Sequence, residues 1–209
     1  MLVKTERMKV ENLKKLFKKV IDSTKNRQVF VVAFDPGVTT GYCVMSEFQP
    51  LMVGEIKTHY LSDLSFKITQ KMNDIFIFLN SNYSITSMVV ENQYFSNQTP
   101  QGLETGQRAG VIVGSAIATL ISLGRQDTIP RLFRPYPNEW GSMYGLGKEG
   151  ARKRKERKNF VNRFTPELFS PPNKFYGEHD QEACMMACWA ELKTRLGDED
   201  LWKDELERL

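Results

Sequence analysis

Cysteine and long apolar segments are scarce in this chain, and each absence excludes a class of protein. Three cysteines occur in 209 residues, at Cys43, Cys184 and Cys188. An odd and sparse set indicates a reducing compartment and not a disulfide framework. No apolar run is long enough to cross a bilayer, and lysines interrupt the N-terminal segment where a signal peptide would need an apolar core. We therefore expect a soluble, cytoplasmic protein without a membrane partner.

The net charge of the chain is small, but its basic and acidic residues are concentrated in different segments. The formal net charge is +4. Residues 1–27 hold nine basic and three acidic side chains, and residues 148–158, KEGARKRKERK, hold seven basic and two acidic ones. Residues 197–209 hold six acidic side chains and two basic ones. Basic segments of this kind favour a polyanionic partner, nucleic acid before membrane, although either segment alone is also typical of a solvated helix face.

The pattern of apolar residues predicts one α/β domain. The chain is 41% hydrophobic, which is enough for a full core, and we find no internal repeat. Periodicity and turn residues predict helices at 5–22, 62–79, 103–122, 148–164 and 179–196, and strands at 29–34, 41–46, 51–58, 85–91 and after residue 128. The proline-rich residues 165–177 predict a loop. Three strands in hairpins, then alternating helices and strands, imply a mixed five-stranded sheet flanked by helices.

Two of the predicted strands end on an acid. Asp35 follows the apolar run VVAF and Glu91 follows SMVV, and both precede polar or turn residues. Such positions gather at one edge of an open α/β sheet, where ligands bind. A third group of acids, with His179, begins the last helix: Glu178, Asp180 and Glu182. Brought together, these side chains would form an oxygen-rich pocket suited to Mg²⁺.

Each acid taken singly also has a structural explanation. Asp35 precedes Pro-Gly and could begin a turn, while Asp180 and Glu182 could stabilise the start of a helix. Glu91 is harder to explain in this way, because a buried carboxylate needs a partner or a metal ion.

Four stretches of the sequence resemble the RuvC-type Holliday junction resolvases, a family within the ribonuclease H-like nucleases. AFDPGVTTGYCVM (33–45) is similar to the first strand pair of that family. VVENQYFSNQTPQGLETGQRAGVIVGSAIA (89–118) resembles its second acid, its junction-probing loop and its long central helix. PNEWGSMYGLGKEGARK (137–153) and HDQEACMMA (179–187) are similar to its basic segment and its last helix. The resemblance runs from about Val29 to Leu192 and implies a ribonuclease H-like fold.

The resemblance also implies a metal-dependent active site, whose catalytic and metal-binding residues would come from Asp35, Glu91, His179, Asp180 and Glu182. Glu182 stands where the family usually has Asp, so either Asp180 or Glu182 could be the working ligand; its position directly before ACMMA favours Glu182. The expected cofactor is Mg²⁺, two ions per site, with Mn²⁺ able to substitute. Two such ions can activate a water molecule and stabilise the leaving oxygen of a phosphodiester.

DNA contacts are expected on both sides of this site. In the family, an aromatic side chain of the loop after the second acid meets the bases at the crossover, which points to Tyr94 and Phe95. We expect Tyr94 to stack on a base and Phe95 to pack beneath the loop. Several relatives carry a lysine where this chain has Trp140, so the basic role could have moved to Lys148, Arg152 or Lys153. The resulting set of predicted phosphate contacts is Lys148, Arg152, Lys153, Arg154 and Lys155.

Three glycines recur every fourth residue of the predicted central helix, at Gly106, Gly110 and Gly114. Glycine inside a helix costs about 1 kcal/mol relative to alanine, so close approach of another backbone should offset it. Because the resolvase family dimerises through this region, the resemblance implies that these glycines line a homodimer interface. Tight packing on the sheet of the same chain is the alternative, most of all for Gly110.

These expectations lead to one function and to several rivals. The first is a crossover junction endodeoxyribonuclease, which makes paired symmetric nicks in four-way DNA. The rivals are a ribonuclease H-like nuclease acting on flaps, forks or RNA/DNA hybrids, a catalytically inactive junction-binding protein, and an ATP-binding actin-like protein. We expect a basic helical extension (1–27), a nuclease domain (28–195) and an acidic tail (196–209). Extensions of this kind occur in phage-type members of the family.

Overall fold

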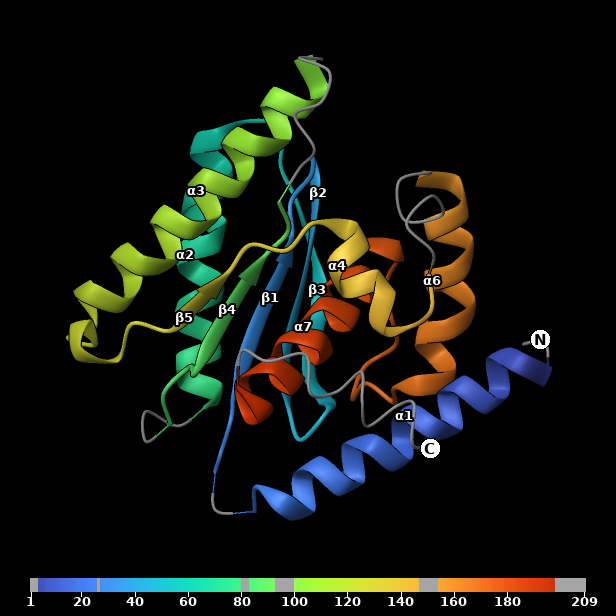
Figure 1. Ribbon diagram of the computed structural model, residues 1–209. Helices are drawn as coiled ribbons and strands as arrows, with labels where there is room; N and C mark the ends of the chain where they lie inside the picture. The colour runs from blue at the N-terminus through green and yellow to red at the C-terminus, as the bar shows by residue number, and fades with distance from the viewer. Residues whose placement is uncertain (1–3, 26, 80–82, 93–99, 147–153, 198–209) are drawn as a thin grey trace.

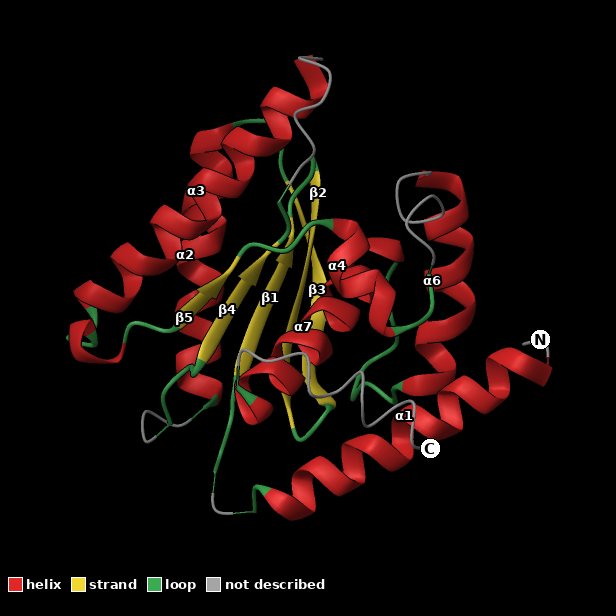
Figure 2. Ribbon diagram, in the orientation of Figure 1, coloured by secondary structure: helices red, strands yellow, loops and turns green. Residues whose placement is uncertain are grey.

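One five-stranded sheet forms the centre of the molecule. The structure is a computed structural model, and it describes residues 4–25, 27–79, 83–92, 100–146 and 154–197. The strands are β1 (Val31–Asp35), β2 (Thr39–Ser46), β3 (Gln49–Lys57), β4 (Ser87–Val90) and β5 (Arg131–Phe133). Their order in space is β3-β2-β1-β4-β5, drawn in yellow in Figure 2. The first three strands pair antiparallel, whereas β4 is parallel to both β1 and β5. The predicted mixed five-stranded sheet is confirmed.

Helices cover both faces of this sheet (Figure 1). Alternate side chains of β1 pack on opposite faces of the sheet, because successive side chains of a strand point in opposite directions. Val31 and Ala33 belong to the core under the helix α7 (Glu178–Leu196), and Val32 and Phe34 to the core under α2 (Leu61–Phe78) and α3 (Pro100–Ser122). The helices are α1 (Lys4–Ser23), α2 (Leu61–Phe78), α3 (Pro100–Ser122), α4 (Pro137–Met143), α6 (Arg154–Leu168) and α7 (Glu178–Leu196), with a 3₁₀ turn η1 (Gln126–Thr128) before β5. In the described part of the chain, no helix has the length and hydropathy needed to span a membrane.

The last helix, α7, is buried along most of its length and crosses the sheet closely. Its first turn lies against Gly41 of β2, where a Cβ atom would overlap the carbonyl group of His179. Only glycine permits this approach of helix backbone to strand. The contact brings the first turns of α7 over the end of β1, and this positions the residues that follow His179 beside Asp35.

The N-terminal helix α1 is part of the main core. Leu13, Leu16 and Phe17 are buried in the same apolar cluster as α6 and α7. The ring of Phe17 stacks on Phe48 from the β2–β3 turn, with 4.4 Å between ring centroids. The apolar side of the predicted amphipathic helix therefore completes the α7 face of the domain. The predicted acidic tail (196–209) lies almost entirely outside the described residues.

Two helices differ from the sequence-based expectation. Helix α4 was not predicted; its start is stabilised by the Glu139 carboxylate, which accepts a hydrogen bond from the Tyr136 N–H at 2.5 Å, and Pro137 occupies the first turn. Helix α6 continues to Leu168, so the start of the segment predicted as a proline-rich loop is helical. Buried Phe164 and Leu168 keep the helical spacing across Pro166, and their packing outweighs the cost of the proline.

Candidate active site

Three buried carboxylates meet at one end of the sheet. Asp35 ends β1, Glu91 follows β4, and Glu182 lies one turn into α7. Because β1 and β4 are parallel neighbours, their carboxyl ends lie side by side, and the Glu91 N–H donates to the Phe34 carbonyl oxygen at 3.3 Å. Asp35, Glu91 and Glu182 each offer an oxygen atom, and these three atoms lie within 4.8 Å of one another. We call this group the carboxylate triad.

Burial and the neighbouring carboxylates make Glu91 and Glu182 costly to ionise. Burial raises the pKa of Glu91 to about 8, and the charges of Asp35 and Glu182 act in the same direction. Burial also raises the pKa of Glu182 to about 7, again with help from Asp35. A divalent cation among these oxygens would favour the ionised forms and displace the protons. Convergent carboxylate oxygens are also the ligands that Mg²⁺ and Mn²⁺ prefer, so this donor set fits a hard cation.

Helix α6 brings an arginine into the triad. The Arg157 Nε–H donates to Glu182 Oε1 at 2.9 Å, and the Arg157 side chain is 16% exposed. Burial by itself would lower the pKa of Arg157, but the charges of Glu182, Glu91 and Asp35 raise it above its ordinary value. The next residue, Lys158, forms an ion pair with Glu178 at the start of α7. The guanidinium therefore lies in direct hydrogen-bond contact with the triad.

His179 connects the triad to the start of α7. Its Nδ1 atom shares a hydrogen bond of 2.5 Å with Asp35 Oδ2, and its Nε2 atom lies 3.6 Å from Glu178 Oε1. Burial would lower the pKa of His179, but the hydrogen bond and the charge of Asp35 raise it above its ordinary value. His179 is thus held directly against one of the three carboxylates.

Asp180 takes a different position from the other acids of this helix. Its carboxylate accepts hydrogen bonds from the backbone N–H groups of Tyr176, at 2.7 Å, and Gly177, at 3.2 Å. It therefore caps the first turn of α7, and it lies outside the carboxylate triad. Of the two ligands between which the sequence left a choice, Glu182 lies in the triad.

Trp140 of α4 also contacts the triad, through Glu91. Its indole Nε1–H donates to Glu91 Oε1 at 3.0 Å, and both side chains are buried. The hydrogen bond lowers the pKa of Glu91 against the larger effect of burial. Where several relatives were expected to carry a lysine, this chain therefore presents a neutral donor to the second acid.

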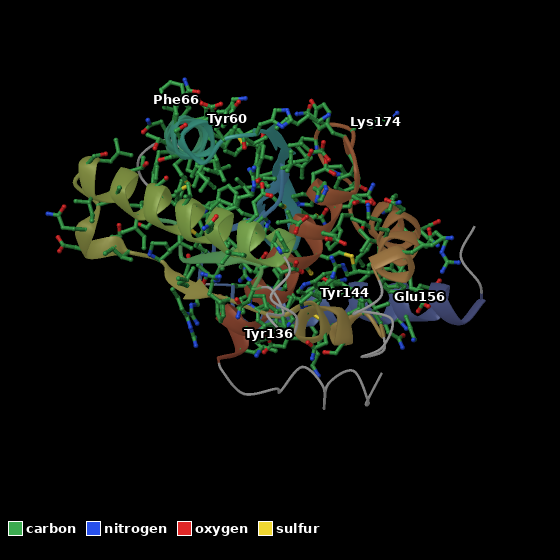
Figure 3. All side chains as sticks on the ribbon, turned by 90° about the horizontal axis from the view of Figure 1, so that it is seen from above. Tyr60, Phe66, Tyr136, Tyr144, Glu156 and Lys174 are labelled. Carbon is green, nitrogen blue, oxygen red and sulfur yellow. The ribbon has the colours of Figure 1, made fainter. Side chains whose placement is uncertain are left out.

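The triad opens into a pocket of about 470 Å³ between α3 and α6. Figure 3 views the molecule from above, with α2 and α3 on one side and α6, marked by Glu156, on the other. On the α3 side, the buried Arg108 donates to the carbonyl oxygens of Thr58, at 3.2 Å, and His59, at 3.0 Å, and pairs with Glu104 at 2.9 Å. Its contact to the Gly37 carbonyl oxygen, at 3.4 Å, ties α3 to the turn that follows Asp35.

Sequence reasoning did not identify Arg157, Lys158 or Arg108 as site residues. Arg157 and Lys158 belong to the basic segment 148–158, but the sequence predicted phosphate contacts only for residues up to Lys155. With α6 beginning at Arg154, residues 157 and 158 lie in its first turns beside α7. Knowing where the helix begins would have pointed to them.

Several predicted contacts lie outside the described residues: Tyr94, Phe95, Lys148, Arg152, Lys153 and the side chain of Arg154. Lys155 is described and is exposed on α6.

The three glycines of the central helix lie on α3. Gly110 and Gly114 are exposed, and a Cβ atom at either would meet nothing within 4 Å. Packing on the sheet of the same chain, the alternative considered for Gly110, is therefore wrong for both residues. Gly106 is half-buried.

Comparison with known proteins gives a fold but no sequence relative. No protein-family model and no curated protein sequence matches the chain. Among solved structures, Thermus thermophilus RuvC is similar both alone (TM-score 0.54, 15% identity, 81% of this chain and 97% of that chain) and in complex with a Holliday junction substrate (TM-score 0.53, 15% identity, 81% and 96%). The yeast mitochondrial Holliday junction resolvase Ydc2 is similar at a TM-score of 0.51 and 14% identity, over 93% of this chain and 89% of that chain. The chain therefore has the fold of RuvC-type resolvases, as the sequence resemblance implied.

Proposed function

We propose that the protein is a Holliday junction resolvase, a metal-dependent endonuclease that makes paired symmetric nicks in four-way DNA junctions. The observation that carries this proposal is the buried carboxylate triad at the strand ends of a RuvC-type fold. A buried surplus of negative charge is unfavourable unless a cation joins it. A divalent cation held there would have the chemistry needed to hydrolyse a phosphodiester.

In the proposed mechanism, Asp35, Glu91 and Glu182 would hold the Mg²⁺ ions, which we expect to number two and which Mn²⁺ could replace. When bound, these ions would supply water activation and stabilisation of the leaving oxygen. We assign Glu182 and not Asp180 as the third ligand, because both oxygens of Asp180 accept backbone hydrogen bonds. His179 holds the Asp35 carboxylate in place through its 2.5 Å hydrogen bond and can carry a proton at Nε2.

The proposed DNA path crosses the pocket. Arg157 and Lys158 line it from α6, and Lys155 extends the basic surface outward. The predicted phosphate contacts Lys148, Arg152 and Lys153 precede this helix in the sequence, and Arg154 is its first residue. Tyr94 and Phe95, which we propose to contact the bases, follow Glu91 by three and four residues in the sequence. This surface supports branched DNA as the substrate.

A homodimer would give the two active sites that paired nicking needs. The exposed surface of α3 supports such a contact, because Gly110 and Gly114 are open and the exposed apolar Leu103 and Ile121 lie about two helical turns away on the same face. A Gly114→Arg substitution should shift the protein from dimer to monomer in light scattering without loss of helical circular dichroism. An unchanged dimer would place the interface elsewhere.

The decisive experiment compares substrates. The purified protein is incubated with a synthetic four-way junction and Mg²⁺ or Mn²⁺, beside linear duplex, flap, fork and RNA/DNA hybrid controls, and the Asp35→Asn variant is run in parallel. We expect paired nicks across the junction that need both the metal ion and Asp35. Equal cutting of every branched substrate would favour a broader ribonuclease H-like nuclease. Junction binding without cutting would indicate a catalytically inactive junction-binding protein.

A further inference from the structure

Arg157 lies where a cation is expected in the carboxylate triad. Its Nε atom is 2.9 Å from Oε1 of Glu182, one of the three carboxylates that could hold a metal ion. The Glu182 side chain is only 4% exposed and that of Arg157 16%, so little water screens the pair. The contact crosses from α6 to α7 and joins residues 25 positions apart in the sequence.

The charge of Arg157 reaches the whole triad. The carboxylate oxygens of Glu182, Glu91 and Asp35 lie within 4.8 Å of one another, so a guanidinium bound to Glu182 acts on all three charges. A buried carboxylate without a counter-ion is strongly unfavourable, so this arginine supplies positive charge that the fold needs when no metal ion is bound. The same positive charge repels a divalent ion that approaches the same oxygen atoms.

We propose that Arg157 is a built-in counter-ion that competes with the divalent cation for the triad, so that metal loading requires the guanidinium to leave Glu182. This inference rests on the metal site of the proposed function, and it does not depend on which DNA is cut.

The pocket offers the displaced side chain a second position. Arg157 and Lys158 both line the 470 Å³ pocket that opens above the triad. A guanidinium matches the two oxygens of a phosphate well, whereas the compact ammonium of lysine does so less specifically. Movement of Arg157 from Glu182 to a DNA phosphate would therefore clear the metal site when the substrate arrives.

Mn²⁺ binding to the DNA-free protein tests the competition directly. Free Mn²⁺ is measured by electron paramagnetic resonance during titration of the wild type, Arg157→Gln, Arg157→Lys and the control Arg163→Gln. Arg163 lies on the exposed part of α6, where its Nε–H donates to the Asn159 carbonyl oxygen at 3.3 Å. Thermal unfolding of each protein, with and without Mn²⁺, reports folding independently of cleavage.

Arg157→Gln should bind Mn²⁺ about tenfold more tightly than the wild type or more, because the competing charge is gone. It should unfold at a lower temperature without metal and gain more from added Mn²⁺. Arg157→Lys and Arg163→Gln should stay near the wild type. If Arg157→Gln binds Mn²⁺ equally or more weakly while the wild type binds well, Arg157 assists the metal and the competition is refuted. If the wild type and Arg157→Gln both fail to bind Mn²⁺, the proposed metal site fails and this inference fails with it.

Discussion

Helix α7 carries two buried charge clusters, and they differ in charge balance. At its start, Glu182 joins Asp35 and Glu91, so that one arginine, together with His179 hydrogen-bonded to Asp35, faces three carboxylates. Near its end, Glu191 pairs with Arg195 at 2.8 Å, one charge against one.

The residues of the second cluster form further hydrogen bonds with neighbouring segments. Glu191 Oε2 accepts the Phe48 N–H at 2.9 Å, and Arg195 donates to Thr24 Oγ1 and to the Arg27 carbonyl oxygen. These contacts fasten the β2–β3 turn and the segment after α1 to α7. A balanced cluster of this kind holds the fold together, whereas the surplus of negative charge in the triad leaves room for a further cation.

The largest expected difference between the clusters is in cleavage. Glu91→Gln removes one negative charge and one proposed metal ligand from the triad. We therefore expect the rate of nicking to fall by more than about 100-fold, which is more than the loss of a hydrogen-bond partner of a metal ligand would cause. Because a neutral amide replaces a carboxylate that is costly to ionise, the metal-free variant should be at least as stable as the wild type at pH 8. Junction-nicking assays and thermal unfolding measure the two effects. Loss of stability together with activity would make Glu91 a structural residue.

The balanced cluster should respond in the opposite way. Glu191→Ala leaves the buried Arg195 without its partner and should lower the free energy of unfolding by about 3–5 kcal/mol. Urea denaturation measures this change, with Lys18→Ala on the exposed side of α1 as a control that should stay within about 0.5 kcal/mol of the wild type. Nicking should survive at temperatures where the variant is folded. Loss of nicking in a fully folded variant would contradict the division between the two clusters.

The sequence predicts the features of this site that depend on a few neighbouring residues better than those that depend on contacts between distant segments. The strand-end positions of Asp35 and Glu91 are local features, because an apolar strand ending on an acid is visible in a few residues. Their meeting with Glu182 also follows from the parallel order of β1 and β4 and from the apolar character of α7.

The remaining features depend on contacts between distant segments. Neither the hydrogen bond from Trp140 to Glu91 nor that from Arg157 to Glu182 has a signature in the adjacent sequence. Asp180 and Glu182 look alike at the start of a helix until the helix is known to begin at Glu178, which makes Asp180 the third residue and a capping acid. The sequence therefore predicted the triad better than the groups that surround it.

A smaller effect on metal binding is expected from substitution of Trp140, the neutral hydrogen-bond donor to Glu91. Trp140→Phe keeps an aromatic ring, smaller than the indole, but removes the donor to Glu91, so Mn²⁺ affinity or nicking should fall by about 10–100-fold. Tyr144→Phe is the matched control, because its hydroxyl donates to the Met185 carbonyl oxygen, at 2.7 Å, and not to the triad. The control should lose about 1 kcal/mol of stability and no metal affinity. Equal metal affinity in Trp140→Phe and the wild type would remove Trp140 from the site.

The most gradual effect is the pH dependence of the metal-free protein. Folding raises the pKa of Glu91 to about 8 and that of Glu182 to about 7, from an ordinary value of 4.5 for each. Between the ordinary and the raised pKa values, the folded protein binds more protons than the unfolded chain. The stability that this proton binding contributes is therefore complete below about pH 4.5 and is lost as pH rises through 7 and 8. Thermal unfolding from pH 5 to 9 should show the decline, and saturating Mn²⁺ or Glu91→Gln should reduce it. Stability that rises over this range without metal would contradict the assigned shifts.

Anomalous X-ray scattering from a crystal soaked in Mn²⁺ tests the central claim most directly. Removal of Arg157's charge by Arg157→Gln makes the soak more sensitive if the proposed competition holds. We predict manganese peaks in contact with carboxylate oxygens of Asp35, Glu91 and Glu182. Well-ordered carboxylates with no manganese between them at saturating concentration, in a protein that still cuts DNA, would contradict the account.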